Sequence, residues 1–159
     1  METKVLKIVY TFFLGVMLAL FVGLGTDTFY PPPAQPSNVS VSSKPTAEEE
    51  ATMQRAWEDY QKAMEPYNRN VSIIAASSAV LLLGASLLLE RRTNVLANGL
   101  MLGGLFTLVY GVGRGFASGD SRTTFITVAV GLAVVIFLGY RRFAGRGAKP
   151  GAAPPAAVA

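Results

Sequence analysis

The stretch NGLMLGGLFTLVYGVGRG (Asn98–Gly115) has the apolar character of a membrane span, yet six of its eighteen residues are glycine. Glycine destabilises the interior of a helix by about 1 kcal/mol relative to alanine. In lipid it has a compensating use, because hydrophobicity does not drive helices together there and small residues let two backbones approach closely. Small residues recur at every fourth position: Gly99, Gly103, Thr107, Gly111 and Gly115. We expect this line, the glycine ridge, to be a helix-packing surface.

A shorter version of the pattern occurs in the first apolar stretch of the chain. Gly15, Ala19 and Gly23 repeat the four-residue spacing there. The glycine ridge can therefore pack against this helix, against a second copy of the chain or against another protein. The spacing alone leaves these three alternatives open.

Four stretches of at least 18 residues contain no charged residue. A helix rises about 1.5 Å per residue, so about 20 residues cross a hydrocarbon core about 30 Å thick. Backbone polar groups must be satisfied internally in that layer, which favours helices. The sequence therefore predicts an all-α membrane protein with four transmembrane helices, over Ile8–Gly25, Val71–Leu89, Val95–Gly113 and Thr123–Tyr140.

Charged residues are distributed unequally between the two sides of this arrangement. Eight Lys and Arg residues flank one side, opposed only by Glu2 and Glu90, whereas the other side has six basic and eight acidic residues. An excess of Lys and Arg in short loops marks the cytoplasmic face. Both termini are therefore predicted to be cytoplasmic. The compact topology and the high usage of Arg, Ala and Gly favour a bacterial plasma membrane.

The segment between the first two spans has two parts. The first is rich in Pro and Ser and is typical of a linker. The second predicts an additional amphipathic helix on the extracytoplasmic side, because Thr46 and Glu49 have the spacing of a capping box. Pro66 is expected to kink, end or redirect this helix. The predicted division of the chain is 1–25 for the N-terminus and first span, 26–45 for the linker, 46–70 for the extracytoplasmic helix, 71–144 for the other three spans with short loops, and 145–159 for a disordered cytoplasmic tail.

One face of the 46–70 helix carries large side chains at spacings of four and three, which places them on one stripe. This Trp57 stripe consists of Met53, Trp57, Tyr60, Met64 and Tyr67. It can pack on the ends of the protein's own spans, which is the favoured interpretation, or bind another protein, since large aromatic and Met side chains are typical interface anchors. The third alternative, an anionic membrane surface, is disfavoured because the flanking charge is mostly acidic.

Arg114 is the one charged residue that could lie within a span. Ionisable residues inside a membrane are rare and often functional. Arg114 lies near the outer end of its helix, however, where its head can reach the interface. Asp27 lies just beyond the first span, and Asp120 lies six residues after Arg114. We predict that Arg114 is an anchor that forms an ion pair with one of these two carboxylates.

The residue types that are missing narrow the function. The chain has no cysteine and no histidine, which excludes disulfides, thiolate nucleophiles, Cys/His zinc sites and His-ligated haem. No Asp, Glu or Lys lies in the middle of a span, whereas proton-coupled carriers usually need one. We therefore predict no catalytic residue, no cofactor and no metal site.

The sequence favours a non-catalytic accessory or scaffold subunit of a membrane. It would act through the glycine ridge and the extracytoplasmic helix, with lipid, other membrane subunits or further copies of itself as partners, and without nucleic acid. The alternative is a small channel or carrier that works as a homo-oligomer. A membrane enzyme ranks last, because it would have to rely on Arg114, Asp27, Asp120 or Tyr110 for its chemistry.

Overall fold

The computed structural model contains four helices in the part of the chain that it describes, residues 2–37, 46–90 and 92–144. All four are long and apolar enough to cross a membrane. The prediction of an all-α protein with four potential membrane spans is therefore confirmed. The helices are α1 (Glu2–Phe29), α2 (Ala47–Leu89), α3 (Asn94–Ala117) and α4 (Ser121–Ala144).

Parts of three predictions lie outside the described residues. These are residues 38–45 of the predicted linker, residues 145–159 of the predicted disordered tail, and Arg91, one of the basic residues on the predicted cytoplasmic side.

The predicted 46–70 helix and the second span form one continuous helix, α2, of 43 residues. Its start is confirmed as a capping box. The backbone N–H of Glu49 donates to the Thr46 hydroxyl at 3.4 Å, and the backbone N–H of Thr46 donates to the Glu49 carboxylate at 2.8 Å. Pro66 lies inside the helix and does not end it. Since proline lacks an N–H, one helical hydrogen bond is lost at this point.

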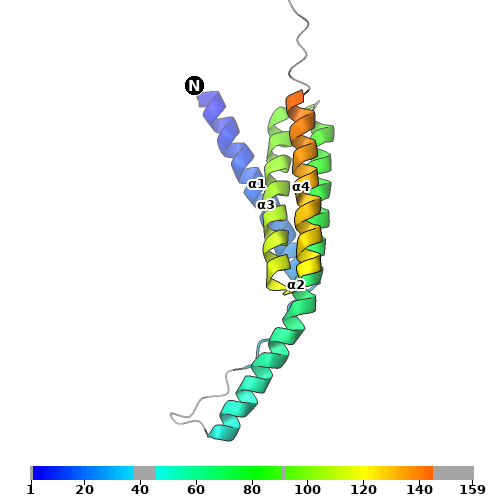
Figure 1. Ribbon diagram of the computed structural model, residues 1–159. Helices are drawn as coiled ribbons and strands as arrows, with labels where there is room; N and C mark the ends of the chain where they lie inside the picture. Colours follow the sequence, from blue (N-terminus) through cyan, green and yellow to red (C-terminus); the bar gives the residue numbers. More distant parts are fainter. Residues whose placement is uncertain (1, 38–45, 91, 145–159) are drawn as a thin grey trace, which may run out of the picture.

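Residues 47–66 of α2, here called the α2 extension, project beyond the bundle, and Figure 1 shows them tilted away from the direction of the membrane-spanning part of the helix. The extension is therefore joined to the bundle by continuous helix and not by a loop.

α3 is the central helix, since its contacts with α2 and α1 are the two most extensive in the bundle and it also contacts α4. Figure 1 shows the second half of α2 running beside α3 and α4, whereas α1 crosses α3 at a slant and its N-terminal half diverges from the bundle. Large apolar side chains on α1 and α4 are exposed, including Phe13, Phe21, Phe125 and Phe137. An apolar surface of this size is typical of contact with lipid.

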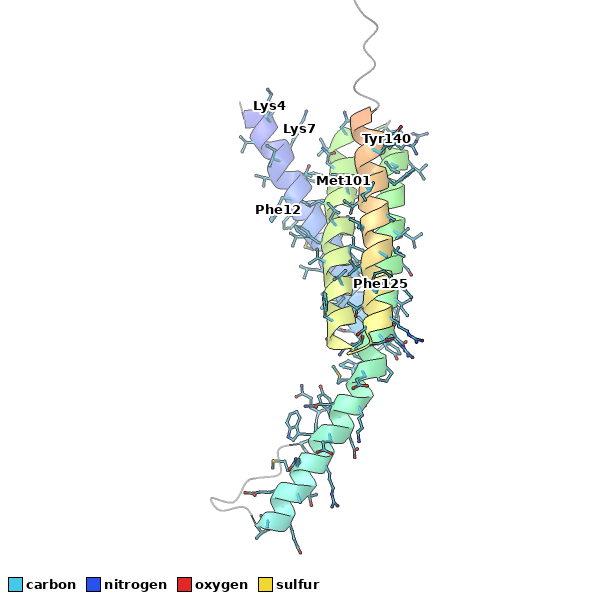
Figure 2. The ribbon with its side chains drawn as sticks, in the orientation of Figure 1. Lys4, Lys7, Phe12, Met101, Phe125 and Tyr140 are labelled. Carbon is cyan, nitrogen blue, oxygen red and sulfur yellow. The ribbon has the colours of Figure 1, made fainter. Side chains whose placement is uncertain are left out.

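The two ends of the bundle differ in charge. One end of the bundle holds the first residues of α1 and α3 and the last residues of α2 and α4. It is here called the basic end, because Lys4, Lys7, Arg92 and Arg141 lie there. Figure 2 shows Lys4, Lys7 and Tyr140 there, while Phe125 lies toward the other end, from which the α2 extension leaves.

The first part of the glycine ridge packs against α1. A Cβ atom added to Gly103 would lie 2.8 Å from Leu18 Cβ and 3.2 Å from the carbonyl oxygen of Gly15. Gly15 is itself a contact point, because a Cβ added there would lie 2.9 Å from Leu102 Cβ. These distances are shorter than the optimal carbon–carbon separation of about 3.5–4.0 Å. Only glycine permits the two backbones to cross this closely.

The rest of the ridge packs against α2 and α4. A Cβ added to Gly111 would lie 3.1 Å from Ala75 Cβ and 3.2 Å from the backbone nitrogen of Ala76. A Cβ added to Gly115 would lie 3.1 Å from Ser72 Oγ of α2 and 3.6 Å from α4. All five ridge residues are buried: Gly99, Gly103, Thr107, Gly111 and Gly115. Of the three alternatives, the structure thus shows the ridge packed within its own chain.

The α1 pattern is used only in part. Gly15 is buried and Ala19 is half-buried, but a Cβ added to Gly23 would have no other atom within 4 Å. Gly23 therefore does not take part in helix packing within the described chain.

We expect Gly103→Leu to destabilise the protein by about 1–3 kcal/mol, the usual effect of overpacking, because the new side chain meets Leu18 and the backbone of Gly15. Gly113→Leu is the matched control on the same helix, since a Cβ at this position meets nothing within 4 Å. The apparent melting temperature in detergent checks the pair. Equal effects at the two positions would contradict the packing described here.

Candidate functional site

The main polar cluster of the structure forms where α2 leaves the bundle, and its centre is Arg114. The Arg114 guanidinium donates from Nε to the Tyr110 hydroxyl at 3.1 Å and from Nη1 to Asn68 Oδ1 at 3.0 Å. Its Nη2 lies 3.8 Å from Asp27 Oδ1, which makes an ion pair without a hydrogen bond. Arg114 thus connects α3 to both α1 and α2. We call these residues, together with Tyr67, the Arg114 cluster.

Aromatic rings hold the guanidinium in place. Its carbon lies 5.5 Å from the ring centroid of Tyr67 and 5.4 Å from that of Tyr110, within the range of a cation–π interaction. The Tyr67 hydroxyl donates to Asp27 Oδ1 at 3.0 Å. Tyr30, just after α1, stacks on Tyr67 with centroids 5.4 Å apart. The end of α1 is therefore tied to α2 by a hydrogen bond and a stacked ring.

Asn68 is the buried anchor of the cluster, with 4% of its surface exposed. Besides accepting from Arg114, it donates from Nδ2 to the carbonyl oxygen of Ala117 at 3.2 Å, which satisfies a carbonyl at the C-terminal end of α3. Asn68 is not among the residues predicted from the sequence. It lies outside the stripe, and no spacing distinguishes it from an exposed asparagine.

Asp120 has a different role from Asp27, although both are possible partners of Arg114 by sequence. Its carboxylate accepts from the Thr123 hydroxyl at 2.6 Å and from the backbone N–H of Arg122 at 3.0 Å, at the start of α4. These hydrogen bonds, from Thr123 first, lower the pKa of Asp120 below its ordinary value. Its ionised form therefore stabilises the folded chain at neutral pH, and this contribution is lost as the pH falls through the lowered pKa.

The Trp57 stripe does not form one packed surface. Tyr67 is buried in the Arg114 cluster, but the extension that carries the other four residues projects beyond the bundle. Trp57 is 39% exposed and packs edge-to-face on Tyr60, with centroids 5.8 Å apart. Met53, Tyr60 and Met64 are half-buried. Of the stripe residues, Tyr67 is the one whose contacts with the ends of the spans are seen among the described residues.

A groove of about 500 Å³ lies between α1 and α3 and ends at the Arg114 cluster. We call it the α1–α3 groove. Its wall is apolar along most of its length and polar at that end. The lining residues are Val16, Ala19, Leu20, Gly23, Leu24, Asp27, Phe106, Tyr110 and Arg114.

The cluster offers hydrogen-bond donors from the Arg114 guanidinium and one acceptor carboxylate from Asp27. A guanidinium donates hydrogen bonds and does not act as an acceptor, and Asp27 is the only carboxylate that contacts it among the described residues. Within residues 2–37, 46–90 and 92–144, no three His, Cys, Asp or Glu side chains are placed to hold a metal ion. The arrangement fits a structural or ligand-binding role.

Comparison with known proteins gives no relative from which a role could be inferred. No family model matches the chain, and no significant match was found among curated proteins or among solved structures.

We expect Asn68→Ala to destabilise the protein more than Asp27→Asn. A buried hydrogen bond to a charged group contributes about 1.5–3 kcal/mol, whereas an exposed ion pair contributes about 0–1 kcal/mol, and Asp27 is 47% exposed. Thermal unfolding in detergent checks this order. Asn70→Ala is the control, since the Asn70 side chain hydrogen-bonds, among the described residues, to the exposed Tyr30 hydroxyl alone. The reverse order would show that the ion pair, not Asn68, holds Arg114.

Proposed function

We propose that this chain is a non-catalytic integral membrane subunit that presents the α2 extension to another protein. The observation that carries the proposal is the continuity of α2, whose 43 residues join a membrane-spanning half to a projecting half without a break. A surface on a continuous helix is held at a fixed distance and direction from the bundle. A surface on a flexible linker would not be.

The extension has the surface chemistry of a docking element. Its apolar stripe includes Trp57, which is 39% exposed, and tryptophan is enriched among residues that dominate binding energy. Six acidic and three basic residues surround the stripe within residues 47–70. A partner with a basic rim around an apolar pocket would complement both features.

The glycine ridge supports this function indirectly. The ridge is buried against α1, α2 and α4, so it stabilises the bundle from which the extension projects. The proposed contact with a partner therefore involves the extension and not the ridge.

We further propose that both termini are cytoplasmic and that the extension is extracytoplasmic, in a bacterial plasma membrane. The support is the gathering of Lys4, Lys7, Arg92 and Arg141 at the basic end, together with the general excess of Lys and Arg on cytoplasmic loops.

The alternative of a homo-oligomeric channel or carrier has less support. Ser72 and Thr127, on α2 and α4, are buried and their hydroxyls lie 3.3 Å apart. The Thr107 hydroxyl donates to the Gly103 carbonyl oxygen within α3. These hydroxyls are thus hydrogen-bonded inside the chain, and a bond such as that between Ser72 and Thr127 is a usual role of such residues between membrane helices.

The orientation can be tested directly, because the chain has no cysteine of its own. We expect a membrane-impermeant thiol reagent to label Gln54→Cys in intact cells. Thr93→Cys, in the turn between α2 and α3, should be labelled only after the membrane is permeabilised. Both positions are exposed. The opposite labelling pattern would show that the chain has the inverse topology.

The function itself can be tested by native mass spectrometry of the protein released gently from its own membrane. We expect a discrete complex with a second protein. Trp57→Ala should weaken that complex by about 30-fold or more, since loss of a dominant interface residue costs at least about 2 kcal/mol. Lys62→Ala is the matched control, because Lys62 lies on the opposite face of the same helix.

Two results would contradict the proposal. A homo-oligomer without another protein would favour the channel or carrier. A monomer alone would show that the extension has no stable partner.

A further inference from the structure

The α1–α3 groove has a form that the proposed function does not explain. α1 and α3 cross closely at Gly15 and Gly103, and beyond this crossing a Cβ added to Gly23 would meet nothing within 4 Å, so open space lies beside α1 there. This space is the apolar part of the groove, lined by Leu20 and Phe106 among others, and it lies between two of the helices that are apolar enough to cross a membrane. In a membrane this space must be filled, because an apolar void forfeits the contacts of its lining.

The polar end of the groove presents both signs of charge. The Arg114 and Asp27 side chains are 27% and 47% exposed, and both line the groove. The distance between Arg114 Nη2 and Asp27 Oδ1 is 3.8 Å, which is too long for a hydrogen bond. Nη2 therefore has no hydrogen-bond acceptor among the described residues. The pair therefore retains capacity to bind a ligand that has an anionic and a cationic group.

The depth of this pair matches the level of a lipid headgroup. Arg114 lies in the last turn of α3, which ends at Ala117, and Asp27 lies in the last turn of α1, which ends at Phe29. Both helices end at the same side of the bundle. The polar end of the groove therefore lies at the bilayer boundary, and its apolar part lies deeper, along the acyl chains.

We propose that the α1–α3 groove is a binding site for a zwitterionic phospholipid with a primary amine, of the phosphatidylethanolamine class. The phosphate accepts hydrogen bonds from Arg114, the ammonium group donates to Asp27, and one acyl chain lies along Leu20, Gly23 and Phe106. A guanidinium and a phosphate form strong charge-assisted hydrogen bonds. The quaternary ammonium group of phosphatidylcholine has no N–H and therefore cannot donate a hydrogen bond to Asp27.

The inference does not depend on the protein partner proposed above. That partner contacts the α2 extension, whereas the lipid contacts α1 and α3. Failure of one experiment therefore leaves the other proposal standing.

Gly23 and Gly25 provide a matched pair of variants for the test. A Cβ added to either residue meets nothing within 4 Å, so neither substitution should disturb packing. Only Gly23 lines the groove. Gly23→Leu should therefore fill the groove and exclude the acyl chain, whereas Gly25→Leu should leave the site open.

The measurement is native mass spectrometry of the full chain in detergent, with phosphatidylethanolamine, phosphatidylcholine and phosphatidylglycerol added in equal amounts. We expect one phosphatidylethanolamine molecule to be retained in preference to the other two. Gly23→Leu should weaken its binding by about ten-fold, which corresponds to about 1.4 kcal/mol. Gly25→Leu should bind it as the unchanged chain does.

Asp27→Asn tests the polar contacts separately. It removes the acceptor for the ammonium group but leaves Arg114, so selectivity should shift toward the anionic phosphatidylglycerol. The melting temperature of each variant is measured as well, so that lipid binding is compared between folded proteins only.

Three outcomes would overturn the inference. The first is equal retention of all three lipids, and the second is equal binding by the Gly23→Leu and Gly25→Leu variants. The third is a second copy of the chain that excludes lipid from the groove.

Discussion

The close approach of α3 to two neighbouring helices is the constraint on which the rest of the structure depends. Lipid supplies no hydrophobic force between helices, so α3 is held by contacts that require a short distance between backbones. Gly103 permits this distance on the side of α1, and Gly111 permits it on the side of α2. The weak helix propensity of glycine is offset here, because α3 is supported along its length by packing. Since α3 contacts every other helix, the loss of either approach would open the bundle.

The Arg114 cluster follows from this packing. Once α3 fixes the positions of α1 and α2, the last turns of α1 and α3 meet the point where α2 leaves the bundle. Asp27, Asn68 and Arg114 then come together from three helices. The contacts tie the base of the α2 extension to the spans, so the extension leaves the bundle in a defined direction. The same end of the bundle provides the polar end of the α1–α3 groove. One cluster thus contributes to both proposed binding surfaces.

The sequence predicted the spans well, because charge-free stretches of sufficient length report directly on the thickness of a bilayer. It also predicted the capping box at Thr46, which depends on contacts three residues apart. It did not predict that the ridge divides between α1 and α2, since this depends on which residues of the two helices, such as Leu18 of α1 and Ala75 of α2, lie beside each glycine. Nor did it predict the role of Asn68 or the open position of Gly23. Both depend on how the neighbouring helices pack around each residue, and no local pattern encodes that geometry. For Arg114 it gave two candidate carboxylates, and the choice of Asp27 required the tertiary arrangement.

Disulfide cross-linking between α1 and α3 in the native membrane tests most directly that the ridge is packed within one chain. A Cβ added to Gly99 would lie 3.2 Å from Leu14 Cβ, close to the separation of about 3.5–4.5 Å across a disulfide. The Leu14→Cys substitution also removes the atoms that the new side chain would meet. A chain carrying both Leu14→Cys and Gly99→Cys should form a cross-linked monomer on oxidation. When a chain with Leu14→Cys alone is co-expressed with a chain with Gly99→Cys alone, oxidation should not cross-link the two chains into a dimer. A strong dimer from that mixture would show that α3 packs against α1 of another copy, and would contradict the arrangement described here.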